Sequence, residues 1–360
     1  MINNSLNVLL LTDLVGERRA FVNITRQLLV DGTYTVLPRD RAVIELLESV
    51  IADETVLEAC RTARDAGYLV ALDDFVLDPK SRPLVQYADI LKIDFLSTDA
   101  HQRKQLAEYF GGGQLMLLAE KVESREQFQE AMDLGYSFFQ GYFFCKPQIV
   151  SGRDVPAVKQ NYLRFIQEVN RPEIDYKRLE ETIKREVSLS TKLFRYLSSA
   201  ALGIRHRLSS IRQALALLGE ASLRKWASVV ALGVLAEDKP AELLVTCLAR
   251  ARFCELLCPE VHLSGRELDL FLMGLFSAMD ALMDQSLDVL ISQIPVPEDV
   301  AAALLGANTS LGRIYRLLLA FERGNASMIE ATSRGLELSA ARAAALYCEA
   351  LKWADGSSAI

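Results

Sequence analysis

Six short apolar runs, each ending at a polar residue, place the strongest constraint on how the first 148 residues fold. The runs occupy residues 20–22, 43–44, 68–72, 90–91, 115–119 and 137–139. Amphipathic segments lie between them: Asp53 can cap a helix that ends at Gly67, and Ser124 opens a capping-box pattern ahead of Gly135. Alternating strands and helices predict a parallel sheet, either open or closed into a barrel.

The polar residues that end these runs recur at intervals of 19 to 28 residues. They are Asn23, Glu45, Asp73 with Asp74, Lys92, Glu120 and Gln140. In a parallel barrel the carboxyl ends of all strands meet at one face, so these side chains would converge on one pocket. Oxygen donors suit Mg²⁺ or Mn²⁺, and a lysine beside them can orient a metal-bound water or a phosphate oxygen. The alternative interpretation is that each residue is a solvated strand end or a helix cap.

The composition favours buried cores and argues against nucleic-acid or membrane partners. Hydrophobic residues make up 51% of the chain, and no apolar run approaches the ~18–20 residues that span a bilayer. Residues 1–152 carry a net charge of −7 and residues 153–360 are neutral, whereas a nucleic-acid footprint needs clustered positive charge. Six scattered cysteines without a Cys-x-x-Cys pair indicate reduced thiols, so we expect a cytoplasmic protein.

The second half has a different periodicity. From residue 153 onward the apolar residues recur at the 3.6-residue period of a helix, as they do at Leu179, Ile183 and Val187. Ser210 can cap a further helix, which ends at Gly219. Proline and glycine residues between positions 147 and 172 mark the joint between the two halves.

Six segments of the first half, in order, resemble the successive motifs of EAL domains. They are Phe21-Val22-Asn23-Ile24-Thr25, Ile44-Glu45-Leu46-Leu47-Glu48-Ser49, Ala71-Leu72-Asp73-Asp74-Phe75, Leu91-Lys92-Ile93-Asp94, Ala119-Glu120-Lys121-Val122-Glu123 and Gln140-Gly141-Tyr142-Phe143. The resemblance covers residue 6 to about residue 150. It implies a barrel-fold phosphodiesterase that hydrolyses cyclic di-GMP with two divalent metals, Mg²⁺ or Mn²⁺.

This resemblance gives each polar residue an expected role. The implied metal ligands are Asn23, Glu45, Asp73, Asp74 and Glu120. Among them, Asp74 would belong to the second metal position. Lys92 and Glu120 would be catalytic, Lys92 by holding the catalytic water. Gln140 and Glu123 would bind the substrate and support the site.

Two departures from the EAL pattern predict a degenerate site. The family's name-giving glutamate lies on a strand ahead of the one that carries Asn23, and no such segment precedes Asn23 here; the chain's Glu-Ala-Leu tripeptide is at 349–351. The loop after the double aspartate, residues 75–79, has no glycine and is stiffened by Pro79. Loss of a ligand and of this loop should impair a two-metal mechanism, and loss of the strand leaves an open barrel edge.

The helical half resembles HDOD domains, which are related to HD phosphohydrolases but have lost their metal ligands. The motifs are Val187-Ser188-Leu189-Ser190, Tyr196-Leu197-Ser198-Ser199-Ala200, Ser210-Ile211, Ala214-Leu215, Leu218-Gly219, Trp226 and Gly274-Leu275-Phe276-Ser277. The match runs from about residue 165 to 350. The three histidines, His101, His206 and His262, include none followed by aspartate, which excludes HD-type hydrolysis.

We therefore predict an α/β fold followed by an all-α fold. An incomplete TIM-type (β/α) barrel would span residues 1–152, a linker 153–164, and an HD-related helical bundle 165–360. The expected function is cyclic di-GMP signalling, with the degenerate EAL barrel as a non-catalytic binding or regulatory module; the alternative is an active metal-dependent phosphodiesterase. Expected partners are cyclic di-GMP and a protein bound through the HDOD domain, with a homodimer left open.

Overall fold

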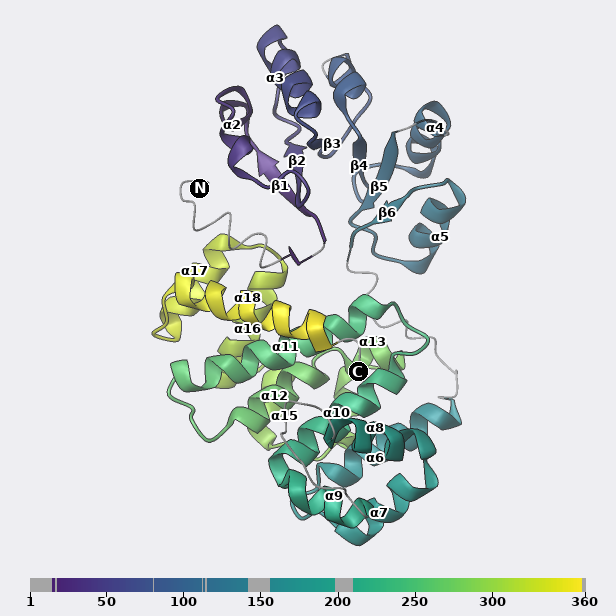
Figure 1. Ribbon diagram of the computed structural model, residues 1–360, viewed down its shortest axis with the longest axis vertical. Coiled ribbons are helices and arrows are strands. Elements are labelled where there is room, and N and C mark those ends of the chain that lie inside the picture. Colours follow the sequence, from purple (N-terminus) through teal and green to yellow (C-terminus); the bar gives the residue numbers. More distant parts are fainter. Residues whose placement is uncertain are drawn as a thin grey trace. The chain divides into compact units, whose positions relative to one another are not determined.

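The computed structural model describes residues 15–141 except 17, 80, 112 and 114, residues 156–197, and residues 210–357. The chain divides into two compact units, Met1–Phe143 and Phe144–Ile360, coloured purple to blue and teal to yellow in Figure 1. The first unit is α/β and the second is all-α, which confirms the predicted fold class. Motif residues 142–143 and 198–200, His206 and residues 153–155 of the expected linker lie outside the described residues.

The first unit contains a six-stranded parallel sheet in which each strand pairs with the next one along the chain. The strands are β1 (Ala20–Ile24), β2 (Ala42–Leu46), β3 (Leu69–Leu72), β4 (Ile90–Asp94), β5 (Met116–Glu120) and β6 (Phe138–Phe139). The register sets Asn23 opposite Glu45, and Asp94 opposite Glu120. The strands therefore end at one edge, and within the described residues they form an open half-barrel.

One face of this sheet carries two layers of side chains. The lower layer is apolar and buried, and consists of Val43, Ala71, Ile90 and Leu118. The upper layer is polar, and consists of the residues two positions further along the chain, Glu45, Asp73, Lys92 and Glu120. Residues two apart on a strand point to the same face, so the polar layer lies at the carboxyl ends of the strands.

The other face of the sheet packs against helices. They are α2 (Arg26–Val30), η1 (Thr33–Val36), α3 (Glu54–Asp65), η2 (Arg82–Tyr87), α4 (Ala100–Phe110) and α5 (Arg125–Asp133). As predicted, Asp53 caps α3: its Oδ1 accepts a hydrogen bond from the backbone N–H of Val56 at 2.9 Å. The buried face of α3, with Val56 and Cys60, shares one core with Ile44 of β2.

The second unit is a helical bundle around its own core. Its helices are α6 (Ala157–Val169), α7 (Tyr176–Arg185), α8 (Val187–Leu197), α9 (Ile211–Leu218), α10 (Glu220–Leu235), α11 (Ala241–Glu260), α12 (Glu267–Phe276), α13 (Met279–Met283), α14 (Leu287–Gln293), α15 (Glu298–Leu304), α16 (Ser310–Glu322), α17 (Ala326–Gly335) and α18 (Ala340–Ser357). Helix α11 packs against both α12 and α18. The core joins residues as far apart in sequence as Phe165, Phe253 and Leu346.

Helix α6 occupies part of the segment that the sequence suggested as a linker. It begins at Ala157, directly after Pro156, where the missing N–H of proline costs no helical hydrogen bond. Phe165 and Ile166 are buried in the core of the bundle, and α6 packs against α10. The prolines in this region thus mark the start of a helix, and we propose that the joint between the domains lies before Ala157.

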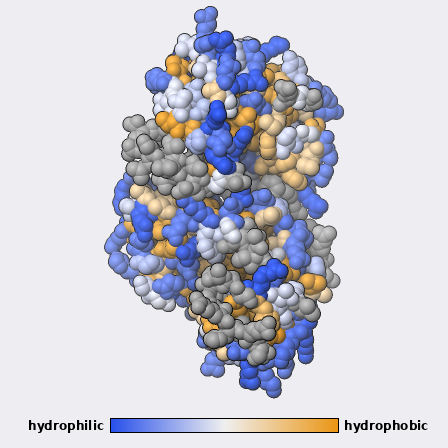
Figure 2. Space-filling view, in the orientation of Figure 1, coloured by the Kyte–Doolittle hydropathy of each residue, from blue (hydrophilic) through white to orange (hydrophobic). Residues whose placement is uncertain are grey.

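On the face drawn in Figure 2, hydrophilic residues predominate and the hydrophobic residues form separate patches. Among the described helices, none combines the length and the hydropathy that crossing a membrane requires. The five cysteines within the described part of the chain are all free thiols, and four of them are buried.

Candidate active site

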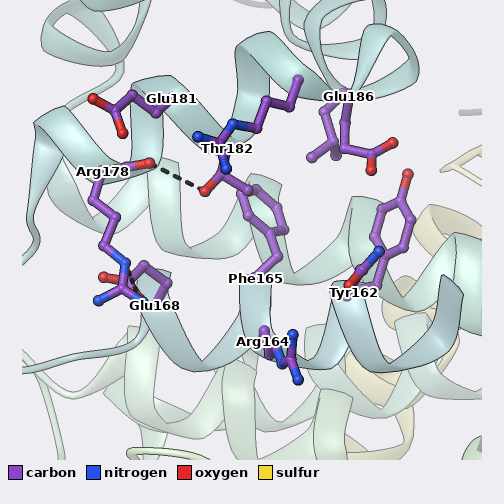
Figure 3. Close-up of a pocket in the computed structure, with 11 residues that line it drawn as sticks. Tyr162, Arg164, Phe165, Glu168, Arg178, Glu181, Thr182 and Glu186 are labelled. Atoms are coloured by element: carbon purple, nitrogen blue, oxygen red, sulfur yellow. Dashed lines mark hydrogen bonds and ion pairs between the residues drawn. The ribbon is translucent and has the colours of Figure 1, made fainter. Parts of the chain in front are cut away.

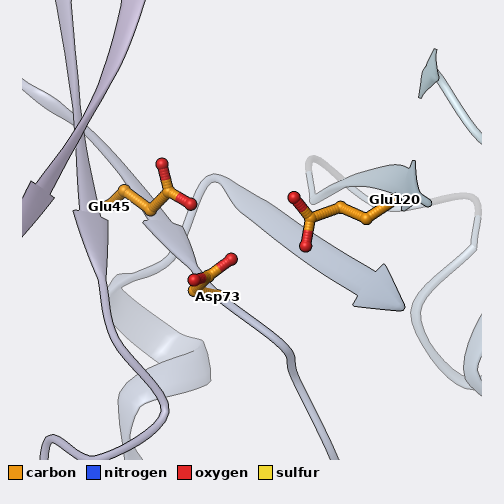
Figure 4. Close-up of side chains that lie close together, drawn as sticks. All are labelled: Glu45, Asp73 and Glu120. Atoms are coloured by element: carbon orange, nitrogen blue, oxygen red, sulfur yellow. The ribbon is translucent and has the colours of Figure 1, made fainter. Parts of the chain in front are cut away.

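Three carboxylates meet at the carboxyl edge of the sheet. Glu45 lies on β2, Asp73 directly follows β3, and Glu120 ends β5. Each offers an oxygen atom within 4.8 Å of the others, and Figure 4 shows the three side chains pointing toward a common centre. Since Glu45 and Glu120 are only 5% exposed, their negative charges need a nearby cation.

Lys92 supplies that cation. Its side chain comes from β4, and its ammonium group donates hydrogen bonds to Glu45 Oε1 and to Asp73 Oδ1, the latter at 2.8 Å. The same nitrogen lies 2.7 Å from Glu120 Oε1. One buried ammonium therefore contacts all three carboxylates, and the group of four keeps a formal charge of −2.

Burial and Lys92 act in opposite directions on the pKa of each carboxyl. Burial raises the pKa of Glu45 to about 7, although its hydrogen bond from Lys92 opposes this. Burial likewise raises the pKa of Glu120 against the same opposing contact. For Asp73, burial acts to raise the pKa, but the hydrogen bonds from Lys92 and neighbouring groups outweigh it and lower the value. Burial acts to lower the pKa of Lys92, but its three carboxylate partners hold it above the ordinary value.

A cavity of about 330 Å³ opens above these residues. Its lining brings together most of the residues singled out in the sequence and two that were not: Phe21, Asn23, Glu45, Asp73, Asp74, Lys92, Glu120, Lys121 and Gln140. Glu123 lies outside this lining. Its backbone N–H donates to Gln127 Oε1 at 2.8 Å, in the turn that starts α5.

Lys121 and Asp94 are charged residues beside this site to which the sequence assigned no role. Lys121 Nζ lies 2.5 Å from Asp94 Oδ2 and 3.5 Å from Asp74 Oδ1. Asp94 is two residues beyond Lys92 on β4, so strand alternation already places it on the same face. Alternation gives no such signal for Lys121, which follows Glu120 and reaches this face because its backbone has a φ of +52°.

The donor atoms suit a divalent metal ion. Carboxylate and amide oxygens are the ligands that Mg²⁺ and Mn²⁺ prefer, and the oxygens of Glu45, Asp73 and Glu120 are close enough to share one ion. A second group, Glu48, Asp73 and Asp74, also has its oxygens within 4.8 Å of one another. Within the described residues, both groups with this chemistry lie in the first unit.

The helical unit has a cavity of its own, of about 370 Å³, between α6, α7 and α8. Figure 3 shows charged side chains around it. The arginines are Arg164, Arg178 and Arg185, and the glutamates are Glu168, Glu181 and Glu186. Arg178 Nε lies 3.3 Å from Glu168 Oε2. Because the numbers of opposite charges are equal, the lining has no net charge with which to select an ion.

Family models match both halves of the chain: an EAL domain over residues 5–147 and an HDOD domain over residues 155–286. The chain belongs to the family of proteins that join an EAL domain to an HDOD domain.

Two relatives match over most of their length. Cyclic di-GMP phosphodiesterase CdgJ of Vibrio cholerae is 35% identical over 321 residues, which cover 88% of this chain and 74% of CdgJ. The uncharacterized protein YuxH of Bacillus subtilis is 31% identical over 361 residues, covering 98% of this chain and 87% of YuxH. Among solved structures, an EAL domain protein from Listeria monocytogenes EGD-e is 23% identical with a TM-score of 0.33. That match covers 38% of this chain and 63% of the Listeria protein.

Proposed function

We propose that this chain is a cyclic di-GMP signalling protein whose EAL barrel binds the dinucleotide as a regulatory module without hydrolysing it at a useful rate. The observation that carries the proposal is the loop at residues 75–79, directly after the double aspartate. This loop has no glycine and is stiffened by Pro79. It departs from the EAL pattern next to Asp73 and Asp74, which are two of the residues expected to bind the metals.

The residues that line the cavity are suited to bind cyclic di-GMP without hydrolysing it. Cyclic di-GMP carries two negative phosphates, for which Lys121, 49% exposed at its side chain, supplies a positive charge. The amides of Asn23 and Gln140 line the same cavity and can donate and accept hydrogen bonds. The ring of Phe21 is 38% exposed there and offers a surface on which a base can stack.

The proposed function is compatible with a metal ion bound in this site. We infer that Mg²⁺ or Mn²⁺ binds through Glu45, Asp73 and Glu120, with Asn23 as a further expected ligand, whereas Asp74 is the ligand expected at the second metal position. When bound, such an ion neutralises phosphate charge and can activate water. Lys92 would then hold a water or a phosphate oxygen by donating a hydrogen bond from Nζ.

The second candidate is a working cyclic di-GMP phosphodiesterase. Two observations favour it: the cavity gathers every expected metal ligand with Lys92 and Gln140, and the relative CdgJ is named a cyclic di-GMP phosphodiesterase. If CdgJ's activity extends to this chain, Glu120 and Lys92 are its catalytic residues.

One experiment separates the two candidates. Purified full-length protein is titrated with cyclic di-GMP by calorimetry, and product is measured by chromatography with Mg²⁺ or Mn²⁺ present. We expect binding with negligible product. Turnover that disappears in Glu120→Ala, and persists in the matched control Glu108→Ala on the exposed surface of α4, would establish the phosphodiesterase instead. Absence of both binding and turnover would overturn both candidates.

For the helical unit we propose a protein partner, since HDOD domains have lost the metal ligands of HD enzymes. The free thiols described above are consistent with a cytoplasmic location.

We also propose that the chain can form a homodimer. Sedimentation of the full chain with and without cyclic di-GMP measures its oligomeric state directly.

A further inference from the structure

We propose that the positive charge of Lys121, which lies beside Asp74, limits the barrel to one divalent metal ion instead of two. The inference rests on the metal site proposed above and goes beyond it by setting the number of ions. Its basis is the position of the Lys121 ammonium between two carboxylates, 2.5 Å from Asp94 Oδ2 and 3.5 Å from Asp74 Oδ1.

The backbone at Lys121 is unusual in a way that directs its side chain into the site. A φ of +52° is left-handed, which a residue with a β-carbon rarely adopts. Neighbouring hydrogen bonds hold it there: the carbonyl of Glu120 accepts from Phe95 N at 3.0 Å, and Val122 N donates to the carbonyl of Gln140 at 3.0 Å. Lys121 is consequently among the residues that line the cavity, next to Glu120.

Each side of the site has its own lysine. Lys92 contacts Glu45, Asp73 and Glu120, which leaves a formal charge of −2, enough to balance one divalent ion. Lys121 contacts Asp94 and Asp74 and neutralises one of these two charges.

The Asp74 side is a poor site for another divalent ion, because an ammonium group already lies beside Asp74. Asp94 is held by more than Lys121, because its Oδ1 accepts from the backbone N–H of Leu96 at 2.7 Å. An ion bound by Asp74 with Glu48 and Asp73 would lie close to the ammonium of Lys121, and the two cations would repel each other.

The number of bound ions tests this inference without any measurement of hydrolysis. Full-length protein is titrated with Mn²⁺ by calorimetry, and bound Mn²⁺ is counted by electron paramagnetic resonance. We expect one ion in the wild type, one in Lys121→Arg, which keeps the charge, and two in Lys121→Gly, which removes it and suits a positive φ. The matched control is Lys104→Gln on the exposed surface of α4, which should bind one ion.

The outcomes distinguish this inference from the proposed site. Two ions in the wild type, or one ion in both wild type and Lys121→Gly, would overturn the role of Lys121 while leaving a metal site in place. No bound ion in any of the variants would overturn the metal site itself, and the inference with it. Glu120→Gln should lose the single ion of the wild type, and retention of that ion would place it elsewhere. Circular dichroism of each variant tests whether a variant that no longer binds the ion is still folded.

Discussion

At the scale of single residues, a buried ion pair in the helical unit matters for stability. Arg250 of α11 donates to Glu322 of α16 through two nitrogens, at 2.6 and 2.8 Å, and to Ser277 Oγ at 3.1 Å. Arg250 is 7% exposed, and the Glu322 side chain is 15% exposed. Removing one member of such a pair leaves the other charge buried without its partner.

We predict that Arg250→Ala destabilises the chain by about 3–5 kcal/mol. Denaturant unfolding followed by circular dichroism measures the change. Arg334→Ala is the control, because its side chain is 79% exposed, and it should stay within about 0.5 kcal/mol of the wild type. The double variant Arg250→Met with Glu322→Leu should recover most of the loss; equal losses in the single and double variants would contradict the importance of the pair.

A second residue-scale prediction concerns Asp280, at the start of α13. Burial raises its pKa above the ordinary value, although a backbone hydrogen bond from Ala281 and the charge of Arg250 oppose this. A carboxyl whose pKa is higher in the folded state favours folding at low pH and loses that contribution as pH rises through the folded pKa. Asp280→Asn, which stays neutral, should therefore stabilise the chain more at pH 7 than at pH 4.

The measurement is the thermal midpoint of wild type and Asp280→Asn across this pH range. Asp288→Asn is a suitable control because the pKa of Asp288 is lowered by its hydrogen bond with Ser286, so its substitution should follow the opposite trend. A difference for Asp280→Asn that shrinks as pH rises would contradict the prediction.

At the scale of elements, α11 and α12 approach each other closely at Gly274. A β-carbon added to Gly274 would lie 2.3 Å from the carbonyl oxygen of Arg250, whereas one added to Gly233 of α10 would meet nothing within 4 Å. Both glycines lie inside helices. In an open helix position, alanine is more stable than glycine by about 0.5–1 kcal/mol.

We predict opposite signs for the two substitutions. Gly233→Ala should stabilise the chain by about 0.5–1 kcal/mol, and Gly274→Ala should destabilise it by about 1–3 kcal/mol because α11 and α12 must separate. Unfolding in urea measures both. Stabilisation by Gly274→Ala would show that the two helices have room to adjust.

The strands and most helices were predictable at this scale because the apolar periods and caps are local properties. Each predicted run became a strand, and Asp53 and Ser124 cap the helices that follow them. Helix α6 was not among the predicted helices, because the prolines that precede it also fit a linker. Its stability comes from packing against α10, which no local pattern shows.

The sequence predicts those residues of the site whose position follows from the alternation of side chains along a strand. Glu45, Lys92 and Glu120 end apolar runs, and the parallel register brings them together. Lys121 was not predictable, because its side chain reaches the site through a left-handed backbone rather than through strand alternation. Glu123 was expected in the site, but although it is close to Glu120 in sequence, it does not line the cavity.

At the scale of the whole molecule, the two units have separate hydrophobic cores. The core with Phe165, Phe253 and Phe276 belongs to the helical unit, and the core with Ile24, Ile44 and Cys60 belongs to the half-barrel. Both groups of carboxylates described above lie in the half-barrel. A unit with its own core can unfold by itself, so a ligand of one unit need not stabilise the other.

We therefore predict two thermal transitions in calorimetry of the full chain, of which Mn²⁺ raises only one. Binding at 100 times the dissociation constant stabilises the folded state by about 2.7 kcal/mol, and this gain belongs to the half-barrel. Gly274→Ala assigns the transitions, since it should lower only that of the helical unit. The upward shift should vanish in Glu120→Gln and persist in Glu108→Gln. A shift of both transitions by Mn²⁺, or a shift that survives Glu120→Gln, would mean that the ion binds outside the cluster around Lys92.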